Sequence, residues 1–389
     1  MNLKKEVWQI VKLIDVCEKA ESIDYRKQIG DFNYVDIGSI NSELNRIAEI
    51  QIINWQNASS RARQVVRKND TLFSTVRVNL KRVALIDNEI PSGIASTGFT
   101  VLRAKEEAIN PFFLFYNSIN PNFLDGLIQL QVGTAYPAVT DKMVLSQEIY
   151  LPPLDEQKRI AELFQSIEQS IIYTEEQEKS LKSVRKFLNN GLTSNPPVFG
   201  NLLSKTKRKL CSFSDIVECI EEHDRSPLEN GLNRFVGLEN IESEIFSLQG
   251  FGNIEDGTTF TKRFTKGDVL FGKRRAYLKK VAVADFDGIC SSDILVFRAI
   301  QKEILPELLL YYVSSDTFMN HAVSTSAGSL SPRTKWRDLA GFQLSIPDIK
   351  TQEKIVDVLN QLSQSLLLLG QQKEALKRLK QKLLSEILG

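Results

Sequence analysis

The sequence has few of the residues that metal or redox chemistry requires. Only 4 cysteines and 2 histidines occur among 389 residues, and no two cysteines are spaced as a CxxC pair. Tetrahedral zinc sites need closely spaced cysteine or histidine ligands. We therefore expect no metal site and no cofactor, and we expect the cysteines to be buried free thiols.

Long apolar runs and a large net charge are also absent. The longest aliphatic run near the C-terminus, residues 366–369, is far shorter than the roughly 20 residues of a membrane-spanning helix. Near the N-terminus, Glu6, Gln9 and Lys12 interrupt the apolar residues, so no secretory signal core forms. We therefore expect a cytoplasmic protein with no membrane segment. Because the net charge is only +1, nucleic-acid binding has to be judged from local charge clusters.

No set of residues predicts an active site. Residues 195–199 resemble the NPP-aromatic motif of amino-methyltransferases, but Val198 separates the second proline from the aromatic residue, and no glycine-rich cofactor loop precedes the motif. Pro347-Asp348 with Glu353-Lys354 resembles a nuclease motif, but these acids lie at a helix start, too close together for a strand-borne site. We expect a non-catalytic chain.

The sequence does contain an internal repeat. Residues 34–37 match residues 235–238 at an offset of 201, and residues 68–73 match residues 266–271 at an offset of 198. From Gly93 onward the offset stays at 195. We interpret the drift as small insertions in the N-terminal part of the second half.

Each half is predicted to be a mixed α/β domain. Short β-branched and aromatic runs at 83–86, 99–102, 281–284 and 294–297 are bounded by glycine, asparagine and aspartate, which is typical of strands and turns. We therefore predict an α+β fold with a pseudo-two-fold internal repeat. Residues 1–150 would form a first domain, 151–194 a first helix, 195–346 a linker and second domain, and 347–389 a second helix.

The two helices carry a seven-residue apolar repeat. Prolines precede both helices, Asp155 and Thr351 are predicted caps, and Gly191 with Pro196-Pro197 is predicted to end the first helix. The heptad spacing predicts an antiparallel coiled coil. An alternative is that each helix lies on its own domain. The predicted pairing residues are Ile160, Ile167, Leu181, Leu188, Ile355, Leu362, Leu369, Leu376 and Leu383.

Basic residues gather at the same place in both halves. Residues 61–82 contain seven basic residues and the single acid Asp70, and residues 262–280 contain eight basic residues and the single acid Asp268. Lysine and arginine bind phosphates, and arginine can also fork onto guanine O6 and N7. The alternative is a solvated positive surface, but the repetition in register favours DNA contacts.

A polar glycine loop also recurs, at residues 132–137 and 327–332. Side chains that differ between the copies, such as Asn79 and Tyr277, are where different base sequences could be read. The predicted DNA-contacting residues of the first half are Arg61, Arg63, Ser74, Arg77, Asn79, Lys81, Arg82, Thr134 and Tyr136. Those of the second half are Lys273, Arg274, Arg275, Tyr277, Lys279, Ser329, Arg333 and Lys335.

With these features the chain resembles the specificity subunits of type I restriction-modification systems. The resemblance rests on residues 70–84, on Gly133-Thr134 and on residues 151–160. It departs from the family pattern at 347–352, which has one proline and no acid directly before the glutamine. It implies a bipartite double-stranded DNA target, with one half-site per target-recognition domain.

The resemblance also implies partners. The helices would dock two methyltransferase subunits and, through them, restriction and translocase subunits, so that methyl transfer and cleavage reside in the partners. Two alternatives remain open at this point. One is a coiled-coil scaffold that binds only protein, and the other is an unrecognised DNA-modifying enzyme.

Overall fold

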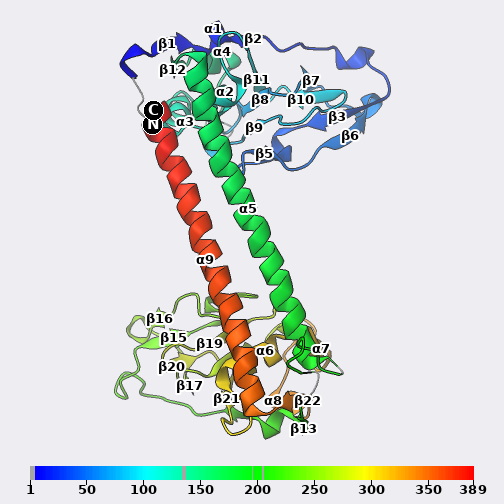
Figure 1. Cartoon of the computed structure of the whole chain (residues 1–389), viewed down its shortest axis with the longest axis vertical. Helices are drawn as coiled ribbons and strands as arrows, with labels where there is room; N and C mark the ends of the chain where they lie inside the picture. Colours follow the sequence, from blue (N-terminus) through cyan, green and yellow to red (C-terminus); the bar gives the residue numbers. More distant parts are fainter. Residues whose placement is uncertain (1–4, 134–136, 195, 204–205) are drawn as a thin grey trace. The chain divides into compact units, whose positions relative to one another are not determined.

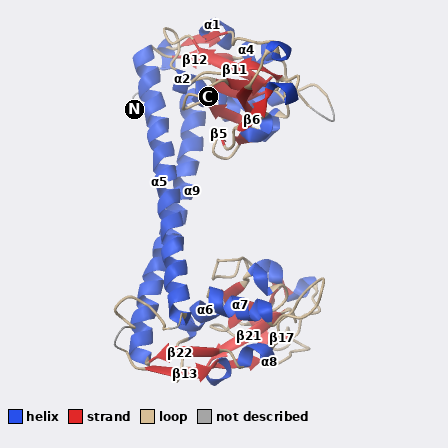
Figure 2. Cartoon of the chain, turned by 90° about the vertical axis from the view of Figure 1, so that its right-hand side faces the viewer, coloured by secondary structure: helices blue, strands red, loops and turns tan. Residues whose placement is uncertain are grey.

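The computed structural model describes residues 5–133, 137–194, 196–203 and 206–389. The chain divides into two compact units. Unit 1 comprises Met1–Glu175 and Gln371–Gly389, and unit 2 comprises Glu176–Gly370. Each unit mixes strands with helices, as the sequence predicted (Figures 1 and 2).

Unit 1 contains two four-stranded sheets. The first has the order β2 (Cys17–Glu18), β11 (Phe99–Ala104), β8 (Thr71–Ser74), β9 (Val83–Leu85). The second has the order β6 (Gln51–Asn54), β3 (Asp31–Val35), β10 (Gly93–Ser96), β7 (Ala62–Val65). The remaining elements include β1 (Gln9–Lys12), which pairs with β12 (Glu148–Leu151), and the helices α1 (Leu13–Val16), α2 (Pro111–Ser118), α3 (Pro121–Gln129) and α4 (Asp141–Leu145).

Unit 2 repeats this topology. Its first sheet has the order β14 (Val217–Ile220), β21 (Ile294–Ala299), β18 (Val269–Gly272), β19 (Val281–Val283). Its second has the order β16 (Gly252–Asn253), β15 (Arg234–Val236), β20 (Gly288–Cys290), β17 (Lys262–Phe264). β13 (Arg208–Ser212) pairs with β22 (Gln343–Pro347), and the short helices are α6 (Pro306–Ser314), α7 (Asp316–Ser324) and α8 (Trp336–Ala340). In both units one parallel pair, β3 with β10 and β15 with β20, occupies the same place, so the repeat inferred from sequence is a repeat of fold.

The insertions that change the repeat offset lie in unit 1. The interpretation that they lie in the second half was therefore wrong. The offset falls between residues 40 and 93, where unit 1 has the hairpin β4 (Ile40–Asn41) and β5 (Arg46–Ile47). The corresponding stretch of unit 2 makes isolated bridges at Ser243 and Ser247 instead. A falling offset means that residues have been added to the earlier copy.

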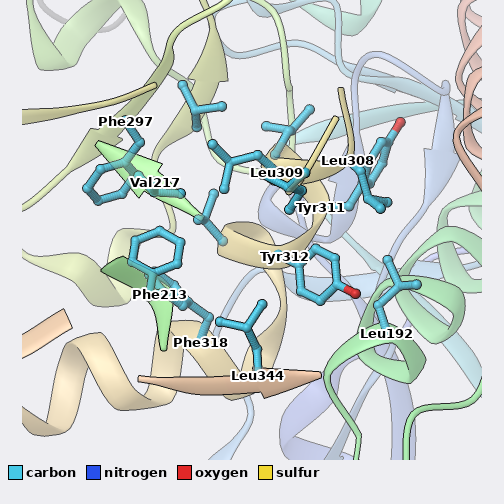
Figure 3. Close-up of a cluster of buried hydrophobic side chains, with 14 of the residues drawn as sticks. Leu192, Phe213, Val217, Phe297, Leu308, Leu309, Tyr311, Tyr312, Phe318 and Leu344 are labelled. Atoms are coloured by element: carbon cyan, nitrogen blue, oxygen red, sulfur yellow. The ribbon is translucent and has the colours of Figure 1, made fainter. Parts of the chain in front are cut away.

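Each unit has its own hydrophobic core. In unit 2, Phe213 packs against Phe297 and Phe318 with ring centroids 5.2 and 4.9 Å apart (Figure 3). Leu192, from the last turns of helix α5, belongs to the same cluster. Interlocked aromatic rings fix the strands against the short helices, and this rigid core holds the loops at the strand ends.

The long helices α5 (Leu154–Thr193) and α9 (Ile349–Leu388) begin just after prolines, as predicted. The predicted caps were wrong. Asp348, not Thr351, caps α9, because its carboxylate accepts the Thr351 N–H at 3.0 Å. At the start of α5, the Pro153 carbonyl accepts the N–H groups of Glu156 and Gln157, and Asp155 lies in the first turn. Helix α5 also continues two residues beyond Gly191, where the Val198 carbonyl packs too closely for any side chain.

The helices pair within each unit. In unit 1, Lys380 of α9 binds Glu168 of α5, and Lys377 lies 3.9 Å from Glu175, so the two segments run antiparallel. In unit 2, Leu188 of α5 packs against the core that contains Ile355 of α9. The antiparallel pairing predicted from the heptads is therefore confirmed in unit 1, and both helices also contribute to the domain cores. Within the described ranges, no helix is long and apolar enough to cross a membrane.

Candidate nucleic-acid interface

The basic cluster of each unit forms a turn with an uncommon backbone, which we call the basic turn (residues 75–82 in unit 1 and 273–280 in unit 2). A 3₁₀ turn at Val78–Leu80 is flanked by Arg77 (φ 51°, ψ 58°) and Lys81 (φ 52°, ψ 37°), both left-handed. In unit 2 the flanking residues are Arg275 (φ 54°, ψ 57°) and Lys279 (φ 51°, ψ 40°).

This backbone is costly for residues other than glycine. Each left-handed L-residue costs about 1–2 kcal/mol, and such residues cluster at functional sites. Both units nevertheless have a pair of basic residues in this backbone conformation at equivalent positions.

The last residue of each glycine loop, Pro137 or Pro332, lies beside the basic turn. In unit 1 the Arg77 N–H donates to the Pro137 carbonyl at 2.7 Å, and Val139 N–H donates to the Thr75 carbonyl at 2.9 Å. In unit 2 the Arg275 N–H donates to the Pro332 carbonyl at 2.8 Å, and Thr334 N–H donates to Lys273 at 3.1 Å. Two segments that are far apart in the sequence thus form one surface in each unit.

Most of the described predicted residues of unit 1 reach solvent. Arg61, Arg77, Asn79 and Lys81 are exposed, and the exposed Arg63 lies over the Tyr25 ring at 5.6 Å. Thr134 and Tyr136 lie outside the described residues.

Two predicted residues of unit 1 point inward instead. Ser74 is buried and its hydroxyl donates to the Val76 carbonyl at 3.0 Å, while Arg82 is half-buried and donates to the Ile37 carbonyl at 2.8 Å. Ser74 thus stabilises the turn itself, and Arg82 ties the turn to the neighbouring segment at Ile37, so neither side chain projects to solvent.

Unit 2 presents its predicted residues differently. Arg275, Tyr277, Ser329 and Lys335 are exposed, while Lys273 is half-buried. The other three predicted cations, Arg274, Lys279 and Arg333, are held by carboxylates.

Lys279 is tied to the end of helix α5. Its ammonium binds Asp316, whose other carboxylate oxygen accepts the Asn190 side-chain amide at 2.8 Å. The Lys279 hydrogen bond lowers the pKa of Asp316 and outweighs the opposing effect of burial. Lys279 therefore braces the basic turn of unit 2, whereas Lys81 makes no such contact within the described part of unit 1.

Asp293 holds two arginines of unit 2. Its carboxylate accepts Arg274 Nη1 at 3.0 Å and Arg333 Nε at 2.8 Å. Burial alone would raise the pKa of Asp293, but the Arg333 hydrogen bond and the surrounding cations lower it below its ordinary value. The carboxylate is therefore charged at neutral pH.

Sequence reasoning missed two side chains that shape these surfaces, Asp293 and Asp316, and two that hold the starts of the long helices, Gln157 and Gln352. Asp293 and Asp316 lie outside the basic clusters, so cation density did not single them out. Gln157 and Gln352 lie at equivalent positions of the repeat but belong to neither predicted set of site residues. Both are buried, and each spans three backbone groups: Gln157 those of Asn110, Ala108 and Pro152, and Gln352 those of Leu305, Glu303 and Pro347. Their recurrence at an offset of 195 was the available signal.

The described residues contain no group of three or more histidine, cysteine, aspartate or glutamate side chains suited to a metal ion. All four cysteines are free thiols, and Cys219 is half-buried rather than buried as predicted. Burial raises the pKa of Cys17 to about 12 and that of Cys211 to about 11. These thiols stay protonated at neutral pH and are poor nucleophiles.

Comparisons with known proteins agree on one family. The model of the type I restriction modification DNA specificity domain matches residues 5–183 and 255–378. The chain is 31% identical over 150 residues to the type I restriction enzyme EcoDI specificity subunit of Escherichia coli. That match covers 38% of this chain and 33% of the relative, so the alignment spans about one third of that relative's length.

Longer matches cover most of the chain. The type I restriction enzyme MjaVIII specificity subunit of Methanocaldococcus jannaschii is 23% identical over 346 residues, which is 83% of this chain and 79% of that protein. The crystal structure of the HsdS subunit from Thermoanaerobacter tengcongensis matches with a TM-score of 0.53 and 26% identity, covering 97% of this chain and 96% of that one. A structure from work on complex assembly and conformational transition of the type I R-M system matches with a TM-score of 0.64 and 26% identity, covering 97% of both chains. The chain belongs to the family of the type I restriction modification DNA specificity domain.

Proposed function

We propose that this chain is the sequence-specific DNA-binding specificity subunit of a type I restriction-modification complex. Each unit reads one half-site of a bipartite double-stranded target. The chain itself is not catalytic. Because the DNA that it binds is cellular DNA, it acts in the cytoplasm.

One observation carries this proposal. The basic turn, with its two left-handed cations, occurs twice at equivalent positions and packs beside the last residue of a glycine loop in both units. A single exposed basic loop is ordinary surface chemistry, but strain retained at the same two positions in both copies indicates a shared ligand. Cations on a fixed turn suit phosphate oxygens, and neighbouring polar side chains can then reach base edges.

The long helices provide surfaces for partner subunits. Tyr173 and Phe187 of α5 are 59% and 70% exposed, and Leu367 of α9 is 55% exposed. Aromatic residues are enriched in protein–protein interfaces, so these exposed side chains support docking along the helices. We propose that two methyltransferase subunits dock there, that restriction and translocase subunits join through them, and that these partners carry out the chemistry.

The DNA-binding proposal is tested by the salt dependence of binding. The full chain with its methyltransferase partners should bind duplex DNA with an affinity that falls steeply with salt. Lys81→Ala should reduce the slope of log K against log salt by about 0.9, the effect of one lost phosphate contact. Lys12→Ala, which removes an exposed charge from β1, is the matched control and should leave the slope unchanged. The absence of any salt-dependent DNA binding by the assembled complex would favour a scaffold that binds only protein.

A further inference from the structure

The two units differ at three positions that meet in space. Unit 1 has Val76, Gly98 and Ala138 where unit 2 has Arg274, Asp293 and Arg333. The backbone around them is the same. Val76 bridges Ala138 as Arg274 bridges Arg333. In unit 1 the Thr75 N–H donates to the Gly98 carbonyl, and in unit 2 the Lys273 N–H donates to the Asp293 carbonyl. Both hydrogen bonds are 2.9 Å long. One unit therefore has an uncharged cluster where the other has two guanidinium groups on one carboxylate.

The charged cluster of unit 2 is both ordered and accessible. The side chains of Arg274 and Arg333 are 43% and 46% exposed, while Asp293 beneath them is 16% exposed. Arg333 uses Nε for its bond to Asp293. Within the described part of the chain, its Nη1 and Nη2 atoms have no hydrogen-bond partner, so the fork of the guanidinium is available to a ligand.

The cluster is not needed to hold the loops together. Unit 1 joins the same three segments through backbone hydrogen bonds and two bridges, with valine, glycine and alanine at these positions. The shared backbone contacts thus form without these charges in unit 1. The presence of the charges in one copy only indicates a role that differs between the copies.

Resting on the proposed function, we propose that Asp293 orients Arg333 and Arg274 to read a guanine in the half-site recognised by unit 2. The free fork of Arg333 donates to guanine O6 and N7, the bidentate contact that specifies this base in the major groove. Unit 1 lacks this cluster and reads its half-site with other side chains. Arg333 and Arg274 are thus specificity-determining residues, and Asp293 is a positioning residue.

Charge and repetition both favour a base over a phosphate as the ligand. Phosphate contacts carry no sequence information, so two units that bind the same backbone would share them. The carboxylate of Asp293 also reduces the net charge of the cluster to +1, which weakens its attraction for a phosphate. A planar donor pair held at a fixed angle suits a base edge.

The test transfers the residues of unit 1 into unit 2. The triple variant Arg274→Val, Asp293→Gly, Arg333→Ala is expressed in the full chain with its methyltransferase partners, and methylated sites are mapped by sequencing. We expect one guanine of one half-site to become degenerate, while the other half-site and the spacing stay unchanged. An unchanged methylation motif would overturn the proposal.

Arg333→Lys is the smaller change and guards against misfolding of the triple variant. It keeps the charge but removes the fork, so the preference for guanine should fall by about tenfold or more while the salt slope of binding stays the same. Retained guanine preference, or an equal loss of affinity for every sequence, would contradict base reading. The proposed function fails separately, if the wild-type complex shows no bipartite motif.

Discussion

Single residues at equivalent positions stabilise both units in the same way. Asp70, which is 1% exposed, accepts two hydrogen bonds from Arg103, the shorter at 2.7 Å. In unit 2, Asp268 binds Arg298 at 2.7 Å. These are the single acids of the two basic clusters, and the structure shows that they tie each cluster to the adjacent strand.

Removal of one partner should destabilise its unit strongly. Asp70→Ala leaves the largely buried Arg103 guanidinium without its counter-charge, and breaking a buried pair in this way costs about 3–5 kcal/mol. Urea unfolding followed by circular dichroism measures the loss. Arg26→Ala, which breaks the exposed pair with Asp24 but leaves that residue's backbone contact in place, is the control and should have no measurable effect. An equally small effect of Asp70→Ala would show that the buried pair is dispensable.

Two variants of Lys81 distinguish the effect of its charge on DNA binding from the effect of its left-handed backbone on stability. Lys81→Gly removes both the charge and the steric cost at φ 52°, whereas Lys81→Ala removes only the charge. Both variants should bind DNA more weakly than the wild type. Lys81→Gly should be more stable than Lys81→Ala by up to about 1 kcal/mol, because glycine adopts this backbone freely although it gains entropy in the unfolded chain. Thermal melts of both variants measure the difference, and an alanine variant as stable as the glycine variant would show that the turn is unstrained.

The sequence predicted which segments form the surface better than which side chains project from it. Basic density and glycine spacing identified both loops. Ser74 and Arg82 turn inward because nearby backbone carbonyl groups need hydrogen-bond donors, that of Val76 within the turn and that of Ile37 outside it. Composition carries no information about that direction, and the left-handed backbone at Arg77 and Lys81 runs against residue preference, so neither was predictable.

At the scale of elements, the two long helices were the most predictable part of the chain. Heptad spacing and the preceding prolines gave their existence, length and pairing. The last turns of α9 do more than pair. Leu384, Ile387 and Leu388 are buried in the core of unit 1, although they lie over 200 residues after its last strand. A periodic stripe shows which face is buried but not which domain covers it.

Truncation of one of these side chains should weaken unit 1 selectively. Leu384→Ala removes a fully buried side chain from its core and should cost about 2–5 kcal/mol. Hydrogen exchange should accelerate in β8 and β11 while β18 and β21 of unit 2 keep their protection. Leu367→Ala, at a 55% exposed position, is the matched control and should change neither set. Faster exchange in both units, or in neither, would contradict this assignment of the helix end.

For the whole molecule, the repeat predicted two units with a shared fold, but not which segments of the chain make up each unit. The offset of 195 could not show that residues 371–389 belong to the first unit, because that depends on packing between segments at opposite ends of the chain. The three positions that distinguish the units were likewise visible in the sequence only as unrelated substitutions. Their meeting around Asp293 depends on the fold.

The central claim is that each unit reads one half-site, and the most direct measurement is a map of methylated sites in cells that carry the full chain and its methyltransferase partners. The wild-type chain should give a motif of two half-sites separated by a gap of fixed length. Asn79→Ala should relax one half-site only, and Tyr277→Ala the other only, because these exposed side chains differ between the copies and lie in separate units. An uninterrupted motif, or a single variant that alters both halves, would contradict the account.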